Sequence, residues 1–254
     1  MKKVYVQIKN GFPINADIQS AVDGFEYLGF DAIGFRIEEI LAGKFDNIAK
    51  LNPFVGSIDC MTALFKRINV YPIPIDFPKE ILDSGLISRK IQILNIDDAI
   101  ANFKRTLIPV FIKPVQTKLF DGILVEDIKY LNYFKGFEGT DVIVSNKLDI
   151  LSEYRVYIHN GKMVYSANYA GDFELIPNYD YVRQVIASYA SAPIAYTVDV
   201  AVVKDKDYIY NDIIEVNDFW AIGNYGLKCW DYAQMLLDRY FEIINYTFDS
   251  GNHQ

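Results

Sequence analysis

The chain has 254 residues, about half of them hydrophobic, and a formal net charge of -8. That length suits one large domain or roughly two or three small lobes around a cleft, and the hydrophobic content excludes an extended disordered chain. An acidic chain without a basic stripe is a poor match for a phosphate backbone, which excludes nucleic acid as the main partner. A nucleotide stays possible, because it needs only a few cations and a metal.

Cysteine and histidine are too scarce for several kinds of site. The two cysteines, Cys60 and Cys229, lie far apart in the sequence, which argues against a disulfide framework or a zinc site. The two histidines, His159 and His253, cannot form a metal cluster. The N-terminus lacks the long apolar run of a signal peptide, and no later segment approaches the length of a membrane span. We therefore expect a cytoplasmic protein without a membrane partner.

The first segment has the pattern of an α/β layer. A short apolar strand is expected over residues 4–8, a helix over 15–28 and a second strand over 31–37. The helix carries its apolar residues on one face, has Asp17 in its first turn and stops at Gly29. We expect a Rossmann-like lobe to extend to about residue 95, with an irregular stretch around Pro72, Pro74 and Pro78.

The remaining chain has the pattern of an antiparallel α+β region. A helix over residues 95–107 precedes a strand over 110–113, and strand-like segments follow at 122–126, 141–144, 153–159, 162–169, 196–203 and 208–217. Asn160-Gly161 between two of them is typical of a type I′ hairpin turn. Helices are expected over 179–190 and 230–244. The predicted domains are therefore an α/β lobe over 1–95 and an α+β region over 96–254.

Two of these strands carry an unusual set of polar residues. Asp199 interrupts a run of valines, and the next strand ends in Glu215-Val216-Asn217. If the strands form a hairpin, both apolar faces must meet the same core, which requires even-numbered residues to lie opposite even-numbered ones, for example Val198 opposite Ile214. A three-residue loop over 205–207 gives this register.

This register places three oxygen-bearing side chains on one face of the hairpin. One or two carboxylates, with the other positions left to water and phosphate oxygens, form the kind of site that Mg²⁺ prefers. Asp199, Glu215 and Asn217 are therefore candidate metal ligands. The same alternation is also typical of an acidic face in contact with water, and the pattern alone does not decide between the two interpretations.

The polar strands, together with segments upstream, resemble the ATP-grasp superfamily. Its aspartate followed by Glu-x-Asn on the neighbouring strand is similar to Asp199 and residues 215–217, and its strand ending in Lys-Pro is similar to residues 110–114. Residues 152–157, leading into Asn160-Gly161, are similar to the central strand after the adenine hinge. The resemblance covers roughly residues 95–245. It implies an ATP-grasp fold, with a Rossmann-like lobe before antiparallel sheets that enclose a nucleotide cleft.

Within the superfamily the chain looks most like a small clade of bacterial and phage proteins. In that clade a second lysine, here Lys118, follows Lys113, and the segment over residues 223–226 is also similar. The loop after the Lys-Pro strand departs from many ATP-grasp enzymes, because it contains only Gly122 where they have a glycine-rich loop. Detailed phosphate geometry therefore does not transfer.

The resemblance assigns a role to each matching residue. It implies that Lys113 and Lys118 contact phosphates, that the backbone at Val144 and Ser145 contacts the adenine edge, and that Glu153 binds the ribose hydroxyls. Arg155 would face the γ-phosphate or an acyl phosphate, which makes Arg155 and Lys118 the expected catalytic residues. Asp199, Glu215 and Asn217 would hold one or two Mg²⁺ ions beside ATP.

The implied activity is that of an ATP-dependent carboxylate–amine ligase that proceeds through an acyl phosphate. Its substrates would be small molecules or peptides that supply a carboxylate and an amine. Two alternatives remain open: a nucleotide-binding regulatory or interaction module without ligase activity, and an ATP-dependent phosphotransferase acting on a hydroxyl. The sequence names neither the substrates nor the oligomeric state.

Overall fold

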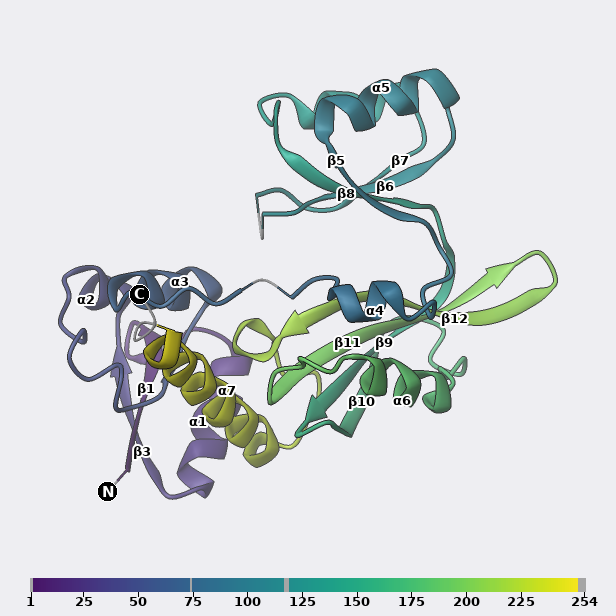
Figure 1. The fold of residues 1–254 in the computed structure, drawn as a ribbon. Helices are drawn as coiled ribbons and strands as arrows, with labels where there is room; N and C mark the ends of the chain where they lie inside the picture. The colour runs from purple at the N-terminus through teal and green to yellow at the C-terminus, as the bar shows by residue number, and fades with distance from the viewer. Residues whose placement is uncertain (1, 74, 117–118, 251–254) are drawn as a thin grey trace.

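The computed structural model describes residues 2–73, 75–116 and 119–250, which form three sheets with covering helices (Figure 1). The first lobe contains β1 (Lys2–Lys9), β2 (Phe12–Pro13), α1 (Ala16–Tyr27), β3 (Phe30–Phe35), α2 (Ile37–Leu41), β4 (Phe54–Val55) and α3 (Ile58–Arg67). β3 and β4 pair with β1 in parallel, and β2 pairs with it antiparallel. The predicted strand, helix and strand at the start of the chain are confirmed.

Local chemistry sets the limits of α1 as expected. The Asn15 side chain accepts a hydrogen bond from the backbone N–H of Ile18 at 2.9 Å and so caps the helix. Gly29 follows the helix at φ +81, a conformation that glycine adopts without strain. These two residues place α1 against β1 and β3.

The second sheet contains β5 (Ile91–Asn95), β6 (Val110–Pro114), β7 (Ile123–Val125) and β8 (Asp141–Asn146), in the order β5-β8-β6-β7. All its pairs are antiparallel. The helix α5 (Ile96–Thr106) and the short 3₁₀ helix η1 (Ile128–Phe134) contribute to its core, in which Phe103, Ile112 and Val142 are buried together. A division after residue 95 would separate β5 from this sheet.

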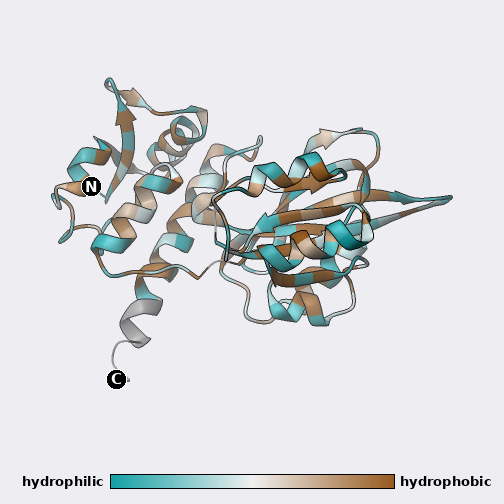
Figure 2. Cartoon of the chain, turned by 90° about the horizontal axis from the view of Figure 1, so that it is seen from above, coloured by the Kyte–Doolittle hydropathy of each residue, from teal (hydrophilic) through white to brown (hydrophobic). Residues whose placement is uncertain are grey.

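The third sheet contains β9 (Asp149–His159), β10 (Lys162–Gly171), β11 (Ala195–Asp205) and β12 (Tyr208–Asp218), in the order β10-β9-β11-β12. Asn160 and Gly161 join β9 to β10 with φ values of 51 and 69, as the predicted type I′ turn requires. The helices α4 (Lys79–Asp83) and α6 (Tyr179–Ser188) bury apolar side chains against the sheet. Figure 2 colours the chain by hydropathy, and its helices carry hydrophobic and hydrophilic residues side by side. β11 is buried from Ala195 to Val203.

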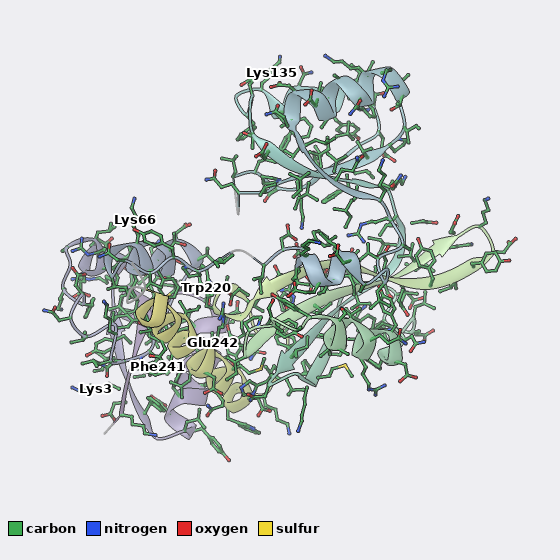
Figure 3. All side chains as sticks on the ribbon, viewed as in Figure 1. Lys3, Lys66, Lys135, Trp220, Phe241 and Glu242 are labelled. Carbon is green, nitrogen blue, oxygen red and sulfur yellow. The ribbon has the colours of Figure 1, made fainter. Side chains whose placement is uncertain are left out.

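The chain returns to the first lobe at its C-terminal end. After the 3₁₀ helix η2 (Phe219–Ala221), the long helix α7 (Cys229–Ser250) packs on α1 and α3 (Figure 3). α7 meets α1 at Gly24, where an added Cβ would lie 2.0 Å from the carbonyl oxygen of Cys229. The first lobe is therefore completed by residues from both ends of the described chain. Over that part of the chain, no helix combines the length and the apolar character that crossing a bilayer requires.

Candidate functional site

The polar face of the third sheet is built on its two central strands. On β9, Glu153 and Arg155 alternate with the buried Tyr154 and Val156, so they point away from the apolar core. Arg155 lies directly opposite Asp199 of β11. Its Nε and Nη2 donate to the two carboxylate oxygens of Asp199 at 2.8 and 2.6 Å. The Asp199 side chain is only 1% exposed, so this bidentate pair is shielded from water.

The turn and the pairing of the β11–β12 hairpin differ from those predicted. The turn contains two residues, Lys206 and Asp207, because Asp205 already pairs with Tyr208. The predicted three-residue loop and the pairing of Val198 with Ile214 are therefore wrong. A β-bulge at Ile214 restores the phase, so that Asp199 lies opposite Glu215. Burial of both apolar faces in one core requires this alignment of the two strands, and the one-residue bulge produces it.

The three expected metal ligands do lie together. The side-chain amide of Asn217 donates to Oε1 of Glu215 at 3.0 Å and to Oδ2 of Asp199 at 3.3 Å. The amide oxygen and nitrogen of Asn217 are exchangeable by a simple flip, so the oxygen can face the same point. Over the described residues, no three His, Cys, Asp or Glu side chains converge well enough to hold a metal by themselves.

Lys113 reaches this face from the second sheet. Its Nζ lies 3.1 Å from Oε2 of Glu215 and 2.6 Å from Oδ1 of Asp76. The Lys113 side chain is 14% exposed, and its amine also lies 5.0 Å from the ring centroid of Phe77. The predicted nucleotide lysine thus bridges a carboxylate of the third sheet and one of the linker that precedes β5.

Asp76 is the site residue that the sequence did not reveal. It stands in the irregular proline-rich stretch, away from any motif. Its backbone carbonyl accepts a hydrogen bond from the N–H of Val216 at 2.8 Å, between Glu215 and Asn217. The linker therefore runs along the outer edge of β12 and brings a second carboxylate to the lysine. A long-range contact of this kind leaves no periodic signal in the sequence.

Burial and pairing set the charge states of the acidic groups. Burial raises the pKa of Asp199 to about 6, against the opposing effect of its hydrogen bonds with Arg155. Burial also raises the pKa of Asp76 despite the Lys113 charge. Burial acts in the same direction on Glu215, but the Lys113 charge and the hydrogen bonds from Asn217 and Lys113 outweigh it, and the pKa is lowered. Glu215 is therefore the most firmly ionised of the three.

Glu153 and Arg155 share a cluster of tyrosines. The Tyr169 hydroxyl donates to Oε2 of Glu153 at 2.5 Å. The Arg155 guanidinium lies against two neighbouring rings, 5.4 Å from the centroid of Tyr169 and 5.1 Å from that of Tyr225. Arg155 is thus held by a carboxylate and two aromatic faces, and one side of Tyr225 remains exposed to solvent.

The loop that carries Tyr225 is fixed by the first lobe. The backbone N–H of Asn224 donates to Oδ1 of Asp17 at 2.8 Å, and its side-chain amide donates to the Ser20 hydroxyl at 2.6 Å. The N–H of Tyr225 donates to the hydroxyl of Tyr157 at 3.1 Å. Residues 223–226, which the sequence singled out, therefore connect α1 to the side chains around Arg155.

The expected adenine contacts at Val144 and Ser145 lie inside β8. Both residues pair with β5 on one side and β6 on the other, so the two ladders use their backbone groups. Lys147 and Leu148, between β8 and β9, lie outside both ladders; we call them the hinge segment. The other expected phosphate ligand, Lys118, falls outside the residues that the structure describes.

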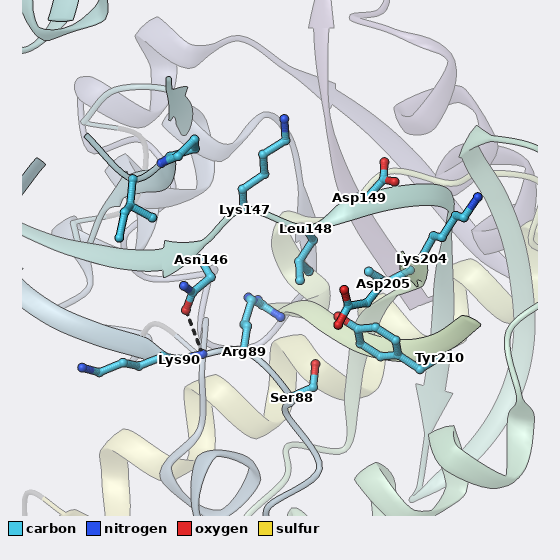
Figure 4. A pocket seen from close by; sticks show the side chains of 13 residues that line it. Ser88, Arg89, Lys90, Asn146, Lys147, Leu148, Asp149, Lys204, Asp205 and Tyr210 are labelled. Atoms are coloured by element: carbon cyan, nitrogen blue, oxygen red, sulfur yellow. Dashed lines mark hydrogen bonds between the residues drawn. The ribbon is translucent and has the colours of Figure 1, made fainter. Parts of the chain in front are cut away.

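A cavity of about 840 Å³ opens beside the hinge segment (Figure 4). Its lining combines the linker before β5, the two residues before β6 and the outer end of the β11–β12 hairpin, with Arg89, Asn146, Lys147, Lys204 and Tyr210 among the residues. Lys113 and the three acidic-face residues do not line it. The cavity and the charged cluster thus lie toward opposite ends of β6.

A family model described as "ATP-grasp domain, R2K clade family 2" matches residues 86–235, which is more than half of the chain. The match begins before β5 and ends within α7, so it contains the second and third sheets with Lys113, Arg155 and the acidic face. Among curated proteins, no sequence matches the chain.

Solved structures of ATP-grasp ligases share the fold. The ligase PsnB complexed with a minimal precursor aligns with a TM-score of 0.57 and 14% identity, over 94% of this chain and 99% of that chain. D-alanine–D-alanine ligase from Bacillus anthracis gives 0.54 and 13%, over 97% and 100% of the two chains. The macrocyclase MdnC bound with precursor peptide MdnA from Microcystis aeruginosa MRC gives 0.57 and 11%, over 94% and 99%. The expected ATP-grasp fold is therefore confirmed.

Proposed function

The chain belongs to family 2 of the R2K clade of ATP-grasp domains, and on that premise we propose that it is an ATP-dependent carboxylate–amine ligase acting through an acyl phosphate. One observation carries the proposal. A single charged network joins the two sheets, from Lys113 of β6 through Glu215 and Asn217 to Asp199 and Arg155. It combines two cations with carboxylates of the kind that hold Mg²⁺, which is what phosphoryl transfer requires.

The nucleotide would extend from the hinge segment to Lys113. We place the adenine edge at the backbone of Lys147 and Leu148, because Val144 and Ser145 have no free backbone groups to offer. Glu153 is the candidate for the ribose hydroxyls, and Lys113 and Lys118 are the candidates for the phosphates. ATP as the cosubstrate also fits the expected cytoplasmic location.

The donor set fits the metal that the family implies. Asp199 and Glu215 lie opposite each other on paired strands, and the Asn217 amide contacts both. Carboxylate and amide oxygens with the remaining positions left to phosphate are typical of Mg²⁺. When bound, Mg²⁺ neutralises charge on the phosphates and polarises the transferring group. Asp199, Glu215 and Asn217 are the residues that would hold it.

The protein's own side chains would then position the substrates and neutralise their negative charges. Attack of a substrate carboxylate on the γ-phosphate brings two anions together and releases ADP, and Arg155 supplies a fixed positive charge beside the rings of Tyr169 and Tyr225. Lys113 supplies the second charge from the opposite sheet. The acyl phosphate loses its phosphate when an amine attacks the carbonyl carbon, which forms the amide. These two reaction steps need little acid–base chemistry from side chains, in agreement with the scarcity of histidine.

The substrates are the least specified part of the proposal. PsnB and MdnC were solved with precursor peptides, and the Bacillus anthracis protein is a D-alanine–D-alanine ligase. We propose a small-molecule or peptide carboxylate and an amine as the partners, with the carboxylate bound near Arg155 and the loop over residues 223–226.

A substrate screen with product analysis tests the proposal. The purified protein is incubated with Mg-ATP and pooled amino acids and dipeptides, ADP is measured, and products of active pools are identified by mass. We expect ADP together with a new amide. ADP with a phosphate ester would instead identify a phosphotransferase. Tight binding of an ATP analogue without turnover in any pool would favour a nucleotide-binding module.

A further inference from the structure

The position of Glu215 depends on one irregularity in β12. The two-residue turn pairs even-numbered residues with odd-numbered ones. Continued along the strands, this pairing would put Ile214 opposite Asp199. Glu215 would then point into the apolar core beside Val198 and Val200. The bulge at Ile214 shifts the strand by one residue, so that Glu215 and Asn217 both face Asp199. The geometry of the acidic face therefore requires that this bulge be held in place.

Arg89 contacts the bulge directly. Its Nη1 donates to the carbonyl of Ile213 at 2.5 Å and its Nη2 to the carbonyl of Ile214 at 3.2 Å. Nη1 also lies 3.0 Å from the Asp212 carboxylate, and the two side chains are 6% and 0% exposed. The same carboxylate accepts the backbone N–H of Ile213 at 2.8 Å and the hydroxyl of Ser88 at 2.5 Å.

These contacts provide hydrogen bonds to backbone carbonyls that have no partner within the sheet. β12 is the edge strand of the third sheet, so the carbonyls on its outer side have no neighbouring strand. A guanidinium presents two donors in a fixed fork, which suits two consecutive carbonyls, whereas an ammonium is a single point charge. Asp212 balances the buried charge of Arg89. Both the bulge and the arginine thus have their polar groups satisfied.

We propose that Arg89 is a positioning residue, which holds the bulge at Ile214 and so presents Glu215 to Asp199 and Asn217. Arg89 also stands two residues before β5, and the neighbouring Lys90 N–H donates to the Asn146 side chain at 3.3 Å. The same short segment therefore connects the sheet that carries Lys113 to the strand that carries Glu215. This inference rests on the proposed function for its catalytic readout.

The test separates metal binding from nucleotide binding. The variant Arg89→Met/Asp212→Asn removes both charges, so neither is left buried without its partner. Arg67→Met/Asp46→Asn removes the bidentate pair of Arg67 and Asp46 in the first lobe and is the matched control. For each protein, thermal unfolding is recorded, ADP release is titrated with Mg²⁺ at saturating ATP, and ADP binding is measured calorimetrically with and without Mg²⁺.

We expect the Arg89→Met/Asp212→Asn variant to need about 10- to 100-fold more Mg²⁺ for half-saturation, the range seen when groups that orient metal ligands are removed. Because Arg89 also lines the cavity beside the hinge segment, the variant is compared by the ratio of its ADP affinities with and without Mg²⁺, which should fall relative to the wild type. The control should match the wild type in every property except the unfolding temperature. Arg89→Lys keeps the pair with Asp212 but cannot reach both carbonyls, so it should raise the Mg²⁺ requirement by less. It serves as the test if the double variant does not fold.

A folded Arg89 variant with the Mg²⁺ requirement of the wild type would overturn the inference and leave the proposed function intact. Absence of ADP release by the wild type would instead count against the proposed function. In that case the Mg²⁺ dependence of ADP binding still decides the role of Arg89, because it needs no turnover. A variant that weakens ADP binding equally with and without Mg²⁺ would show a contact with the nucleotide and would also overturn the inference.

Discussion

The second and third sheets have the same number of strands and the same antiparallel pairing, yet they contribute to the site in different ways. The third sheet carries the acidic face and Arg155, joined by hydrogen bonds between neighbouring strands. The second sheet contributes Lys113, whose amine meets Glu215 across the space between the sheets. The acidic face and Arg155 are therefore assembled on a single sheet, and Lys113 extends to them from the other sheet.

This difference has an energetic consequence. Asp199 is 1% exposed and its partner Arg155 is 12% exposed, whereas the carboxylates that hold Lys113, Asp76 and Glu215, are 29% and 32% exposed. A fully buried carboxylate keeps an uncompensated charge when its partner is removed, whereas carboxylates that are about a third exposed regain part of their contact with water. Substitution of Arg155 should therefore affect stability as well as activity, and substitution of Lys113 should affect activity much more than stability.

The largest effect on activity is expected for Glu215→Ala. It removes the most firmly ionised carboxylate of the acidic face while leaving the buried Arg155–Asp199 pair intact. Metal-dependent ADP formation should fall by about 1,000-fold, the scale for loss of one electrostatic stabiliser of a transition state. Glu26→Ala, on the exposed side of α1, is the control. Wild-type turnover in a folded Glu215→Ala protein would exclude Glu215 from the site.

The largest effect on stability is expected for Arg155→Met. The substitution leaves the Asp199 carboxylate buried without its bidentate partner, which should cost about 3–5 kcal/mol in the free energy of unfolding. Denaturant unfolding of the metal-free protein measures it. Added Mg²⁺ should restore part of the loss if Asp199 is a metal ligand. A loss below about 1 kcal/mol, the range of exposed pairs, would show that the two sheets do not differ as described.

Lys113→Met is the matching substitution in the second sheet. The free energy of unfolding should change by less than about 1 kcal/mol, because Asp76 and Glu215 can both regain water. The value of kcat/KM for ATP should fall by about 10- to 100-fold, which corresponds to the loss of a hydrogen bond to a charged group. A strong loss of stability with unchanged kinetics would assign Lys113 a structural role only.

The elements of the third sheet could be predicted from sequence because their signals are local. Alternation identified the strands, and Asn160-Gly161 identified the turn between β9 and β10. The clustering of Asp199, Glu215 and Asn217 followed from the requirement that both apolar faces meet one core. The position of the bulge could not be predicted, because its carbonyls are bound by Arg89, which is more than 100 residues away in the sequence.

The contributions of the linker were hidden for the same reason. Asp76 and Arg89 belong to an irregular stretch without periodicity, and their roles come from contacts with β12. The short elements β2, β4 and α4 also went unrecognised, because so few residues show no period. The adenine contact at Val144 and Ser145 came from the family resemblance and stays a prediction. The strand there was expected to end at residue 144, whereas β8 continues to Asn146, because its end depends on pairing with β5 and β6.

The smallest effect is expected for Asp76→Asn, which sharpens the distinction between the two halves. In the structure the Asp76 carboxylate holds the lysine amine at 2.6 Å, where a nucleotide phosphate would have to bind. Removing the negative charge should release Lys113 and lower the KM for ATP by about fivefold, which corresponds to a partly exposed ion pair of about 1 kcal/mol. The kcat value should stay the same, because Asp76 lies outside the acidic face.

Asp83→Asn provides the control for Asp76→Asn, since Asp83 lies on α4 in the same linker and pairs with the exposed Lys79. Steady-state kinetics over a range of ATP concentrations separates KM from kcat for both variants. If Asp76→Asn raises the KM for ATP, the carboxylate holds Lys113 in the orientation that binds phosphate and does not compete with it. Lys113 would then be pre-positioned like the acidic face, and the contrast between the two sheets would be limited to burial.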